Sequence, residues 1–427
     1  MTVRRIHSAR VHGRLRAPPS KSYTHRALLA AFFAEAPCEV VGPLSSDDTR
    51  ATRNGLHTLG ARVRRSRDGW LVSRSVPAPP TRYRTIQCAE SGTTFRFLAA
   101  AAALGARPIG FVGTRRLASR PMIDLFGALR SLGATVEAPS EARCLPCKIR
   151  GPIRAGRVEM RGDVSSQFTS ALLMVLPGLA GRSEIRIQGP TVSRPYIDAT
   201  CAVLAQRGIQ VRRLRTGFVI EGPQRYRSGR IRVPGDASSA AYLWAAAAAT
   251  DGQVEIEGVP ADLPQADLAI LPILAAMGAR VRRTPRFVGV SGALVEPISV
   301  DLTDSPDLFP LVAVLAALVP GRSSHLSGAP HLAFKESDRR LESARLARGL
   351  GARVTASRSG LEICGSATPR ALNCPTLQDH RLVMSAAVAG LATHGISRIG
   401  RAEAVSKSFP GFWSAIGTLT NGGGLLR

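Results

Sequence analysis

The chain has 427 residues, of which 44% are hydrophobic, and its 57 basic and 30 acidic residues give a formal net charge of +27. This length predicts about two or three domains of roughly 150 residues each, and the ordinary apolar content excludes a chain that is disordered throughout. The apolar run at 308–320 is too short to span a bilayer, which takes about 20 residues, and the N-terminal residues lack the apolar segment of a signal peptide.

The charge comes almost entirely from arginine. Only four basic residues are lysines, namely Lys21, Lys148, Lys335 and Lys407. The arginines occur in ones and twos without a long basic block, which favours an arginine-rich solvated surface over a nucleic-acid partner. Seven scattered cysteines, an odd number, indicate a reducing compartment and no disulfide framework. Cys144 and Cys147 form one C-x-x-C without the second ligand pair of a structural zinc site, so we predict no metal.

A short motif containing glycine recurs six times along the chain. Each copy follows an amphipathic stretch, such as 122–129, and is a variant of Leu-Gly-Ala-Arg-Val. Glycine at such a position ends a helix, and the β-branched residue after it begins a strand. These glycines lie 70 to 75 residues apart, at Gly60, Gly133, Gly208, Gly278, Gly351 and Gly422.

A second marker has the same period. Six predicted helices begin at a small or polar cap and continue into an apolar run, near Ser22, Thr93, Ser165, Ser238, Asp307 and Asp379. Because these helices are apolar nearly all round, we expect them to be buried. The chain is therefore predicted to consist of six units of about 72 residues, each with two helices and interleaved strands, in two domains of three units.

Unusual polar residues collect at the starts of the six buried helices. A helix N-terminus has free N–H groups and a partial positive charge, so several such ends could converge on an anionic ligand. Capping alone explains the serines, threonines and aspartates, but it does not explain Lys21, Arg26, Gln167 or Arg381. Three of the four lysines lie in these or similar polar motifs, which favours a role that arginine cannot fill.

Taken together, the motifs resemble the 5-enolpyruvylshikimate-3-phosphate synthase family of enolpyruvyl transferases. The resemblance spans nearly the whole chain in the family's order, through PPSKSYTHRALL, ESGTTFRFL, SRPM, DVSSQFTSALLM, VSRPYID, VPGDASSAAY, DSPDLFPL, KESDR, DHR and SKSFP. It implies an α/β protein of two inverted α/β barrel domains, each of three βαβαββ units with helices inside and sheets outside. The implied first domain comprises 1–15 and 235–427, the second comprises 16–234, and the active site lies in the interdomain cleft.

The resemblance also implies a reaction. The enolpyruvyl group of phosphoenolpyruvate would pass to the 5-hydroxyl of shikimate 3-phosphate with release of phosphate, by addition and elimination through a tetrahedral intermediate. This is a step of the shikimate pathway to chorismate and the aromatic amino acids. A cytoplasmic monomer without cofactor or metal is implied, with these two small molecules as its partners and neither nucleic acid nor membrane.

Residue roles follow from the matching motifs. The implied phosphoenolpyruvate ligands are Lys21, Gly92, Arg120, Gln167, Arg339, Arg381 and Lys407. The implied shikimate 3-phosphate ligands are Lys21, Ser22, Arg26, Ser165, Ser166, Gln167, Ser193, Tyr196, Asp307, His331 and Lys335. The candidate catalytic residues are Lys21, Asp307, Glu336 and Lys407. Asp307 would accept the hydroxyl proton, and Glu336 or Lys407 would deliver the proton to C3, in an order that the sequence leaves open.

Three positions depart from the family's usual residues. Glu90 stands where asparagine is common, His331 where an asparagine contacts the shikimate phosphate, and Phe97 where proline is common. A carboxylate at Glu90 would repel phosphoenolpyruvate unless an arginine pairs with it. These departures bear on affinity and inhibitor response, and they leave the reaction class unchanged.

Three alternatives remain. UDP-N-acetylglucosamine enolpyruvyl transferases share the fold but use a loop cysteine, and 117–122 contains none. A basic nucleic-acid-processing protein would explain the charge but not KESDR, DHR and SKSFP. A non-catalytic paralogue is disfavoured by the intact charged residues of the motifs.

Overall fold

The structure, a computed structural model, describes residues 2–74, 84–140, 142–328 and 330–426. The chain divides into two compact units. Unit 1 comprises Met1–Pro18, Gly235–Ala261 and Gln265–Arg427, and unit 2 comprises Pro19–Pro234 and Asp262–Pro264. Unit 1 includes β2 (His12–Arg16), because this whole strand pairs with β15 (Gln253–Glu257).

Each unit contains three four-stranded sheets. In unit 2 the sheet orders are β14-β3-β5-β4, β6-β7-β9-β8 and β10-β11-β13-β12. The bounds of these strands are β3 Cys38–Val41, β4 Ala61–Arg65, β5 Gly69–Arg74, β6 Arg84–Gln87, β7 Ile109–Val112, β8 Thr135–Glu137, β9 Cys147–Arg150, β10 Arg157–Arg161, β11 Gly181–Gln188, β12 Arg212–Leu214, β13 Gly217–Gly222 and β14 Gly229–Arg232.

Unit 1 repeats the pattern. Its sheet orders are β16-β17-β15-β2, β18-β19-β21-β20 and β22-β23-β1-β24. The remaining strand bounds are β1 Val3–His7, β16 Arg280–Arg283, β17 Phe287–Ser291, β18 Ser299–Asp301, β19 Ser323–Ser327, β20 Arg353–Ala356, β21 Leu361–Cys364, β22 Asn373–Cys374, β23 Ile396–Gly400 and β24 Leu425–Leu426.

The six sheets share one topology. Two neighbouring strands run parallel, and the other two pairings are antiparallel, as in β6-β7-β9-β8. In three sheets, two in unit 2 and one in unit 1, all four strands follow one another in the sequence. Each of the other three sheets includes one strand that is distant in the sequence. Thus β14 joins β3, while β1 and β2 join β23 and β15. The six expected repeats of the two-domain α/β fold are confirmed.

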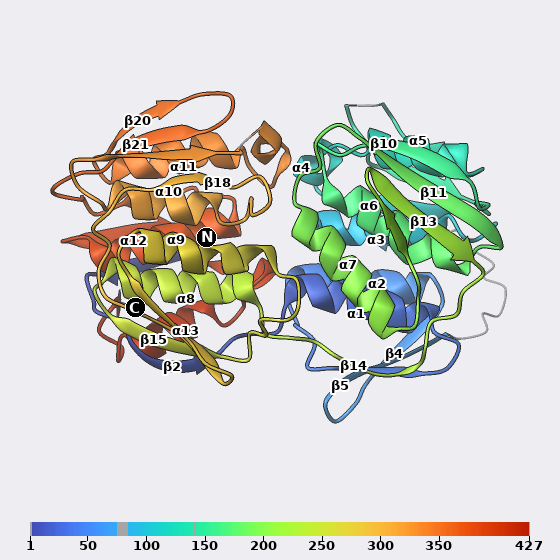
Figure 1. The fold of residues 1–427 in the computed structure, drawn as a ribbon, viewed down its shortest axis with the longest axis horizontal. Coiled ribbons are helices and arrows are strands. Elements are labelled where there is room, and N and C mark those ends of the chain that lie inside the picture. The colour runs from blue at the N-terminus through green and yellow to red at the C-terminus, as the bar shows by residue number, and fades with distance from the viewer. Residues whose placement is uncertain (1, 75–83, 141, 329, 427) are drawn as a thin grey trace. The chain divides into compact units, whose positions relative to one another are not determined.

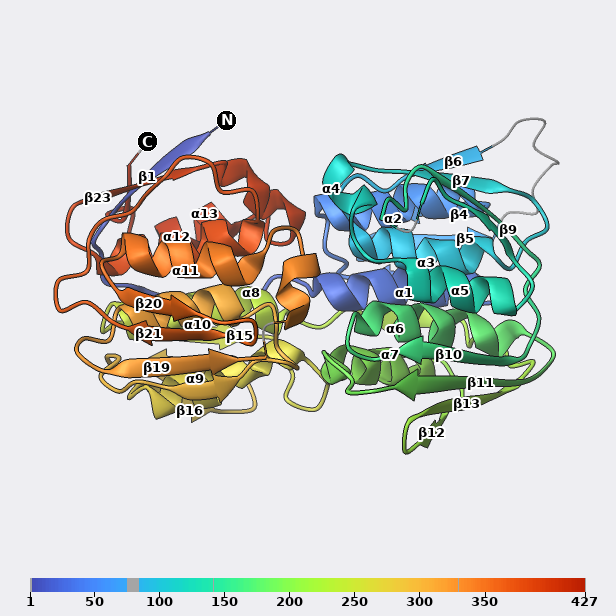
Figure 2. The same ribbon diagram turned by 90° about the horizontal axis from the view of Figure 1, so that it is seen from above.

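The helices form an inner and an outer set in each unit. The inner helices are α1 Lys21–Phe33, α3 Gly92–Ala102 and α6 Ser166–Val175 in unit 2, and α8 Ala237–Ala249, α10 Phe309–Ala317 and α12 His380–Ala392 in unit 1. Nearly all of their side chains are buried, as the apolar sequences predict. Figures 1 and 2 show these helices inside each unit and the sheets on its outer faces.

The outer helices end where the repeated glycines predict. They are α2 Asp47–Thr58, α5 Ile123–Ser131, α7 Arg194–Gln206, α9 Ile270–Ala276, α11 Arg339–Gly349 and α13 Phe412–Leu419. Each is followed by a glycine with positive φ, from +77° at Gly208 to +110° at Gly278. Glycine adopts this left-handed conformation without a Cβ penalty, which explains why the chain turns there.

Five of the six inner helices begin with a side-chain cap. Ser20, Ser91, Ser165, Asp236 and Asp379 each accept a hydrogen bond from a backbone N–H of the first turn. The exception is α10, where the N-cap position is Leu308 without a side-chain bond. The expected cap at Asp307 is therefore wrong, because its carboxylate contacts two arginines instead.

Short elements complete the fold, namely α4 Arg115–Ala118 and the 3-10 helices η1 Leu176–Gly178, η2 Ala266–Ala269, η3 Pro330–Phe334 and η4 Ala402–Lys407. Within the described residues, none of the helices has the length and apolarity needed to cross a membrane.

Candidate active site

The N-termini of α1, α3 and α6 meet in unit 2 through polar side chains. Gln167, at the start of α6, accepts a hydrogen bond of 2.6 Å from Arg96 Nη1 and donates one of 3.0 Å to Thr93 Oγ1. Arg96 also donates to the carbonyl of Pro121 and lies over the ring of Phe168. The buried Arg96 guanidinium thus positions the predicted ligand Gln167, a role that its motif did not reveal.

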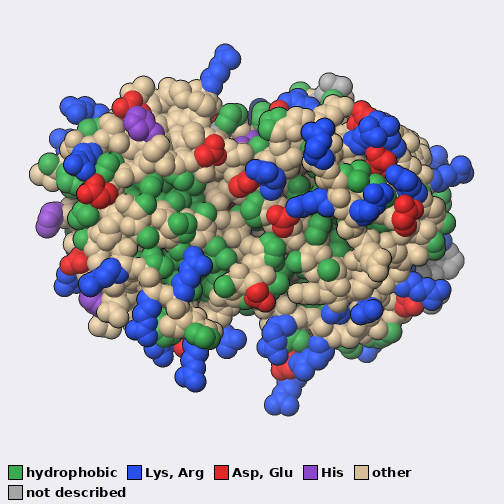
Figure 3. Space-filling view, viewed as in Figure 1, with side chains coloured by type: hydrophobic (Ala, Val, Ile, Leu, Met, Phe, Trp, Pro, Cys, Tyr) green, Lys and Arg blue, Asp and Glu red, His purple; other side chains and the backbone are tan. Residues whose placement is uncertain are grey.

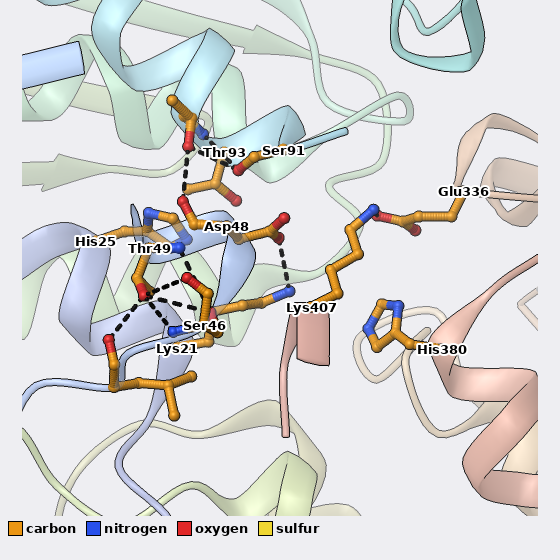
Figure 4. Close-up of polar contacts among 12 residues, drawn as sticks. Lys21, His25, Ser46, Asp48, Thr49, Ser91, Thr93, Glu336, His380 and Lys407 are labelled. Carbon is orange, nitrogen blue, oxygen red and sulfur yellow. Dashed lines mark hydrogen bonds and ion pairs between the residues drawn. The ribbon is translucent and has the colours of Figure 1, made fainter. Parts of the chain in front are cut away.

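Lys21 lies at the first position of α1 and pairs with a carboxylate. Its Nζ is 3.1 Å from Asp48 Oδ2, and the two side chains are 16% and 7% exposed. Figure 4 shows Lys21 reaching toward Asp48 from the neighbouring helix. A partly buried ion pair fixes the ammonium as a compact charge in one place, which suits a group that must meet an anion in a defined position.

A buried network of hydrogen bonds lies next to this pair and consists of one histidine and several hydroxyl groups. His25 Nδ1 is 2.7 Å from Thr52 Oγ1, which is 2.7 Å from Thr94 Oγ1. Thr94 Oγ1 contacts the backbone carbonyl of Asp48 and the cap Ser91. Burial lowers the pKa of His25 to about 3, so this histidine is neutral. The network therefore holds α1, α2 and α3 together around Lys21. Figure 4 shows His25, Asp48 and Ser91, which come from or cap these three helices.

Gly92 allows two arginines to approach the start of α3. A Cβ at this position would lie 2.8 Å from Arg120 Nη1 and 3.0 Å from Arg96 Nη1. Cys144 holds the loop that carries Arg120, because its thiol donates hydrogen bonds to the backbone carbonyls of Ala118 and Arg120. Burial raises the pKa of Cys144 to about 11, so this thiol stays protonated and acts here as a donor.

Arg26 connects α1 with α7. Its guanidinium donates to Thr200 Oγ1 and to the backbone carbonyls of Ser22 and Tyr196, at 2.7 to 2.9 Å. It lies 5.5 Å above the ring centre of Phe97, one of the positions that depart from the family. The predicted ligand Arg26 therefore positions the Ser22 and Tyr196 segments, and Phe97 supports it.

Two further predicted groups border this part of unit 2. Ser193, the N-cap of α7, is a buried non-glycine residue at φ +56°, a costly conformation that is often kept at functional sites. Ser165 caps α6, and Ser166 follows it in the first turn. Glu90 is exposed and directly precedes the cap of α3.

In unit 1, Arg339 contacts three carboxylates. Its Nε is 2.7 Å from Asp379, its Nη1 2.5 Å from Asp307 and its Nη2 3.0 Å from Glu336. Burial acts to lower the pKa of Arg339, but the surrounding carboxylates outweigh it and hold the pKa well above the ordinary value. The side chain is only 2% exposed, so these contacts are made away from bulk water.

The same carboxylates bind the other predicted cations. Arg381 Nη2 is 2.7 Å from Asp307 Oδ2, and Lys407 Nζ is 3.6 Å from Glu336 Oε1. Figure 4 shows Lys407 pointing toward Glu336. The structure thus brings together Asp307, Glu336, Arg339, Arg381 and Lys407, although they come from four separate segments of the chain.

His331 and Lys335 lie on and just after η3. His331 is buried, and burial together with the nearby Lys335 charge lowers its pKa to about 3. Its Nε2 has no hydrogen-bond partner among the described residues. A neutral imidazole with an open nitrogen can donate or accept one hydrogen bond according to its tautomer.

Sequence reasoning missed four carboxylate or hydroxyl groups of these clusters. Asp48 stands in the capping segment Ser46–Thr49, and Asp379 was interpreted only as a cap although it also pairs with Arg339. Tyr242 on α8 is fully buried near Arg381. Asp267 on η2 is 1% exposed and accepts a hydrogen bond from Ser238 Oγ. The available signal for Asp267 was a lone carboxylate within the otherwise apolar stretch 266–274.

Replacing Asp267 by asparagine should change how stability depends on pH. Burial, with a contribution from Asp307, raises the pKa of Asp267 from 3.8 to about 7. The folded state therefore holds a proton that the unfolded state loses, so stability falls as pH rises from about 4 to about 7, by up to about 4 kcal/mol. Asparagine cannot ionise, so we expect the Tm of Asp267→Asn relative to the parent protein to rise between pH 5 and pH 8. A constant difference across this range would contradict the assignment.

The high positive charge and Lys148 belong to the solvent-exposed surface. The basic side chains visible in Figure 3 occur singly or in small groups interspersed with acidic and apolar ones. Lys148 is 55% exposed and lies 3.8 Å from Glu137. No group of three or more potential metal ligands occurs among the described residues.

Comparisons with known proteins agree with the geometry. The family model described as EPSP synthase (3-phosphoshikimate 1-carboxyvinyltransferase) matches residues 6–416. A 3-phosphoshikimate 1-carboxyvinyltransferase of Methanocorpusculum labreanum is 39% identical over 409 residues, which cover 95% of this chain and 96% of the relative. One of Thermococcus kodakarensis is 40% identical over 405 residues, covering 94% and 96%.

Solved structures show the same fold. An EPSP synthase from Acinetobacter baumannii superposes with a TM-score of 0.80 at 24% identity, covering 98% of both chains. The family model and the full-length relatives together leave no doubt about ancestry: the chain belongs to the EPSP synthase (3-phosphoshikimate 1-carboxyvinyltransferase) family.

Proposed function

We propose that this protein transfers the enolpyruvyl group of phosphoenolpyruvate to the 5-hydroxyl of shikimate 3-phosphate and releases phosphate. The observation that carries this function is the match of relatives with that activity in their names over about 95% of the chain. Two of the three alternatives, a UDP-N-acetylglucosamine enolpyruvyl transferase and a nucleic-acid-processing protein, are not supported by these relatives. The reaction belongs to the shikimate pathway of aromatic amino acid biosynthesis.

The electrostatics of both clusters favour this chemistry. Phosphoenolpyruvate and shikimate 3-phosphate carry phosphate and carboxylate groups, which planar arginines bind in a bidentate manner. Unit 1 offers Arg339, Arg381 and Lys407, and unit 2 offers Lys21 and Arg120, with helix N-termini in both units. We propose that the two clusters act on the same pair of substrates, with the ligand assignments that the motifs imply.

In the proposed mechanism, the 5-hydroxyl oxygen of shikimate 3-phosphate bonds to C2 of phosphoenolpyruvate. Asp307 accepts the proton of this hydroxyl as the bond forms. C3 receives a proton from Glu336 or Lys407, which gives a tetrahedral intermediate. One C3 proton then returns to the group that supplied it, Glu336 or Lys407, as the C2–O bond to phosphate breaks. Phosphate leaves, and the C2–C3 double bond forms again. The ion pair in which Lys407 Nζ lies 3.6 Å from Glu336 Oε1 supports this proposal because it keeps the two candidate proton donors next to each other.

A phosphate-release assay tests the function. We expect release only when both phosphoenolpyruvate and shikimate 3-phosphate are present. Release with UDP-N-acetylglucosamine and none with shikimate 3-phosphate would overturn the assignment. We also propose that the protein acts in the cytoplasm, which is supported by its seven free cysteines, and that it acts as a monomer.

Replacing Lys21 by arginine should lower the rate at least about tenfold, which corresponds to roughly 1.4 kcal/mol of transition-state stabilisation. The planar guanidinium cannot occupy the position of the ammonium 3.1 Å from Asp48 without displacing it. Lys148→Arg is the matched control, because its side chain is 55% exposed. Steady-state kinetics of the two variants check this, and equal, full activity of both would refute the special role of Lys21.

Replacing Gly92 by alanine should raise KM for phosphoenolpyruvate several-fold. The added Cβ would meet Arg120 Nη1 at 2.8 Å and push this proposed ligand aside. Gly127→Ala on α5 is the control, because its Cβ would meet nothing within 4 Å. A KM for phosphoenolpyruvate that is unchanged in Gly92→Ala would argue against Arg120 as a ligand.

A further inference from the structure

The outer faces of the sheets pair opposite charges across neighbouring strands. Residues that lie directly opposite each other and also form ion pairs include Arg14 with Glu255, Arg230 with Glu39, Lys148 with Glu137, and Arg182 with Glu221. These pairs come from four different sheets. In a fifth sheet, His325 lies opposite Glu362. Opposite charges at such positions stabilise a sheet, whereas like charges destabilise it.

The sheet β22-β23-β1-β24 departs from this pattern. Arg5 of β1 lies directly opposite Arg398 of β23, and Asn373 of β22 is the next residue across. Among the described residues this is the one pair of like charges in direct register, and neither arginine has a carboxylate within ion-pair distance there. Figure 2 shows β1 and β23 side by side at the outer surface of unit 1. The repulsion would be relieved if an anion lay between the two guanidinium groups.

An open surface cavity lies at the same place. Its volume is about 530 Å³, and it is lined by the exposed residues Val3, Arg5, Asn373, Pro375 and Arg398. None of these residues belongs to the clusters to which the reaction is assigned. The lining offers two guanidinium forks, one amide and two apolar side chains, and it contains no acidic group.

We propose that Arg5 and Arg398 bind a small oxyanion, a phosphate monoester or a carboxylate, in this cavity, with Asn373 as a third hydrogen-bonding group. Guanidinium forks match the two oxygens of a carboxylate or phosphate in a bidentate arrangement. The Asn373 amide can donate to a remaining oxygen. The bound anion would neutralise the two arginines, as a carboxylate on the neighbouring strand does in the other sheets. Val3 and Pro375 would contact the carbon skeleton of the ligand.

Arginine-specific labelling of the full chain with phenylglyoxal, mapped by peptide mass spectrometry, tests the proposal. The probes are inorganic phosphate and succinate, with sodium chloride at equal ionic strength as the reference. We expect labelling of Arg5 and Arg398 to slow at least about threefold at a probe concentration of twice its Kd. The exposed Arg280 and Arg283 of β16 are the internal controls and should react at an unchanged rate.

Variants locate the effect. Arg5→Gln should abolish the protection of Arg398, whereas Arg280→Gln, with the same change in charge, should leave it intact. Both variants should keep the phosphate-release activity. Protection by phosphate or by succinate identifies which oxyanion the site prefers. Slowing by chloride alone, equal slowing at Arg280 and Arg283, or protection only by a single-stranded oligonucleotide would each overturn the proposal of a small-oxyanion site.

Discussion

Replacing Asp307 by asparagine is expected to lower kcat by about 10²- to 10⁴-fold, the usual contribution of a general base. Asparagine retains the shape of the side chain and one acceptor oxygen for Arg339 or Arg381, but it cannot take up the hydroxyl proton. Because Asp307 contacts both arginines at 2.5 and 2.7 Å, a smaller change in the KM values should accompany the loss. The measurement is steady-state phosphate release with each substrate varied in turn.

The control for this variant is Asp251→Asn. Asp251 belongs to the same unit, is 54% exposed and pairs with Arg10 at the surface. It is one of the few non-glycine residues with positive φ, a conformation that asparagine tolerates. We expect Asp251→Asn to keep full activity. If Asp307→Asn retained kcat within tenfold of the parent protein, another group would have to accept the proton.

Replacing Arg339 by methionine should destabilise unit 1 by about 3–5 kcal/mol, because three carboxylates would lose a buried counter-charge. Asp379 is fully buried and would be affected most. For a unit of about 200 residues this corresponds to a decrease in Tm of roughly 6 to 20 °C. Differential scanning calorimetry at neutral pH is the measurement, with urea unfolding as a second one.

Arg345→Met on the same helix is the matched control. Its side chain is 76% exposed, and its Nη1 lies as far as 4.0 Å from Glu342 Oε2, so the ion pair is weak. We expect its Tm to change by no more than about 2 °C, corresponding to about 0.5 kcal/mol. A loss in Arg339→Met no larger than that of Arg345→Met would show that the carboxylates find other partners.

Local features of the fold were predictable from the sequence because short-range rules govern them. The glycine at the end of each outer helix was visible as a repeat, and Gly133 and Gly351 adopt the left-handed conformation that this pattern requires. The inner helices could be placed because they are apolar nearly all round. Their caps at Ser165 and Asp379 were correct, since a short polar side chain satisfies free N–H groups within its own turn.

Partners that are distant in sequence could not be predicted from such rules. Nothing near Asp307 shows that its oxygens would bind arginines 32 and 74 residues further along the chain. The cap prediction failed there because two charge-assisted bonds are stronger than one cap bond. Asp48 and Asp267 were missed for the same reason, since their roles depend on Lys21 and on the first turn of α8. The parallel pairing of β2 with β15 likewise joins segments about 240 residues apart.

By itself, the sequence determined the six repeats, the α/β class, the family and the ten motifs that carry the polar residues. The repeats and the pattern of helices and strands depend on spacing along the chain, which local conformational preferences translate into secondary structure. The family followed from the resemblance of the ten motifs. Only the tertiary structure decided which charges meet, because ion pairs form wherever folding brings side chains together. It placed Arg339 among three carboxylates, joined Lys21 to Asp48, and left Arg5 facing Arg398 on the surface of unit 1.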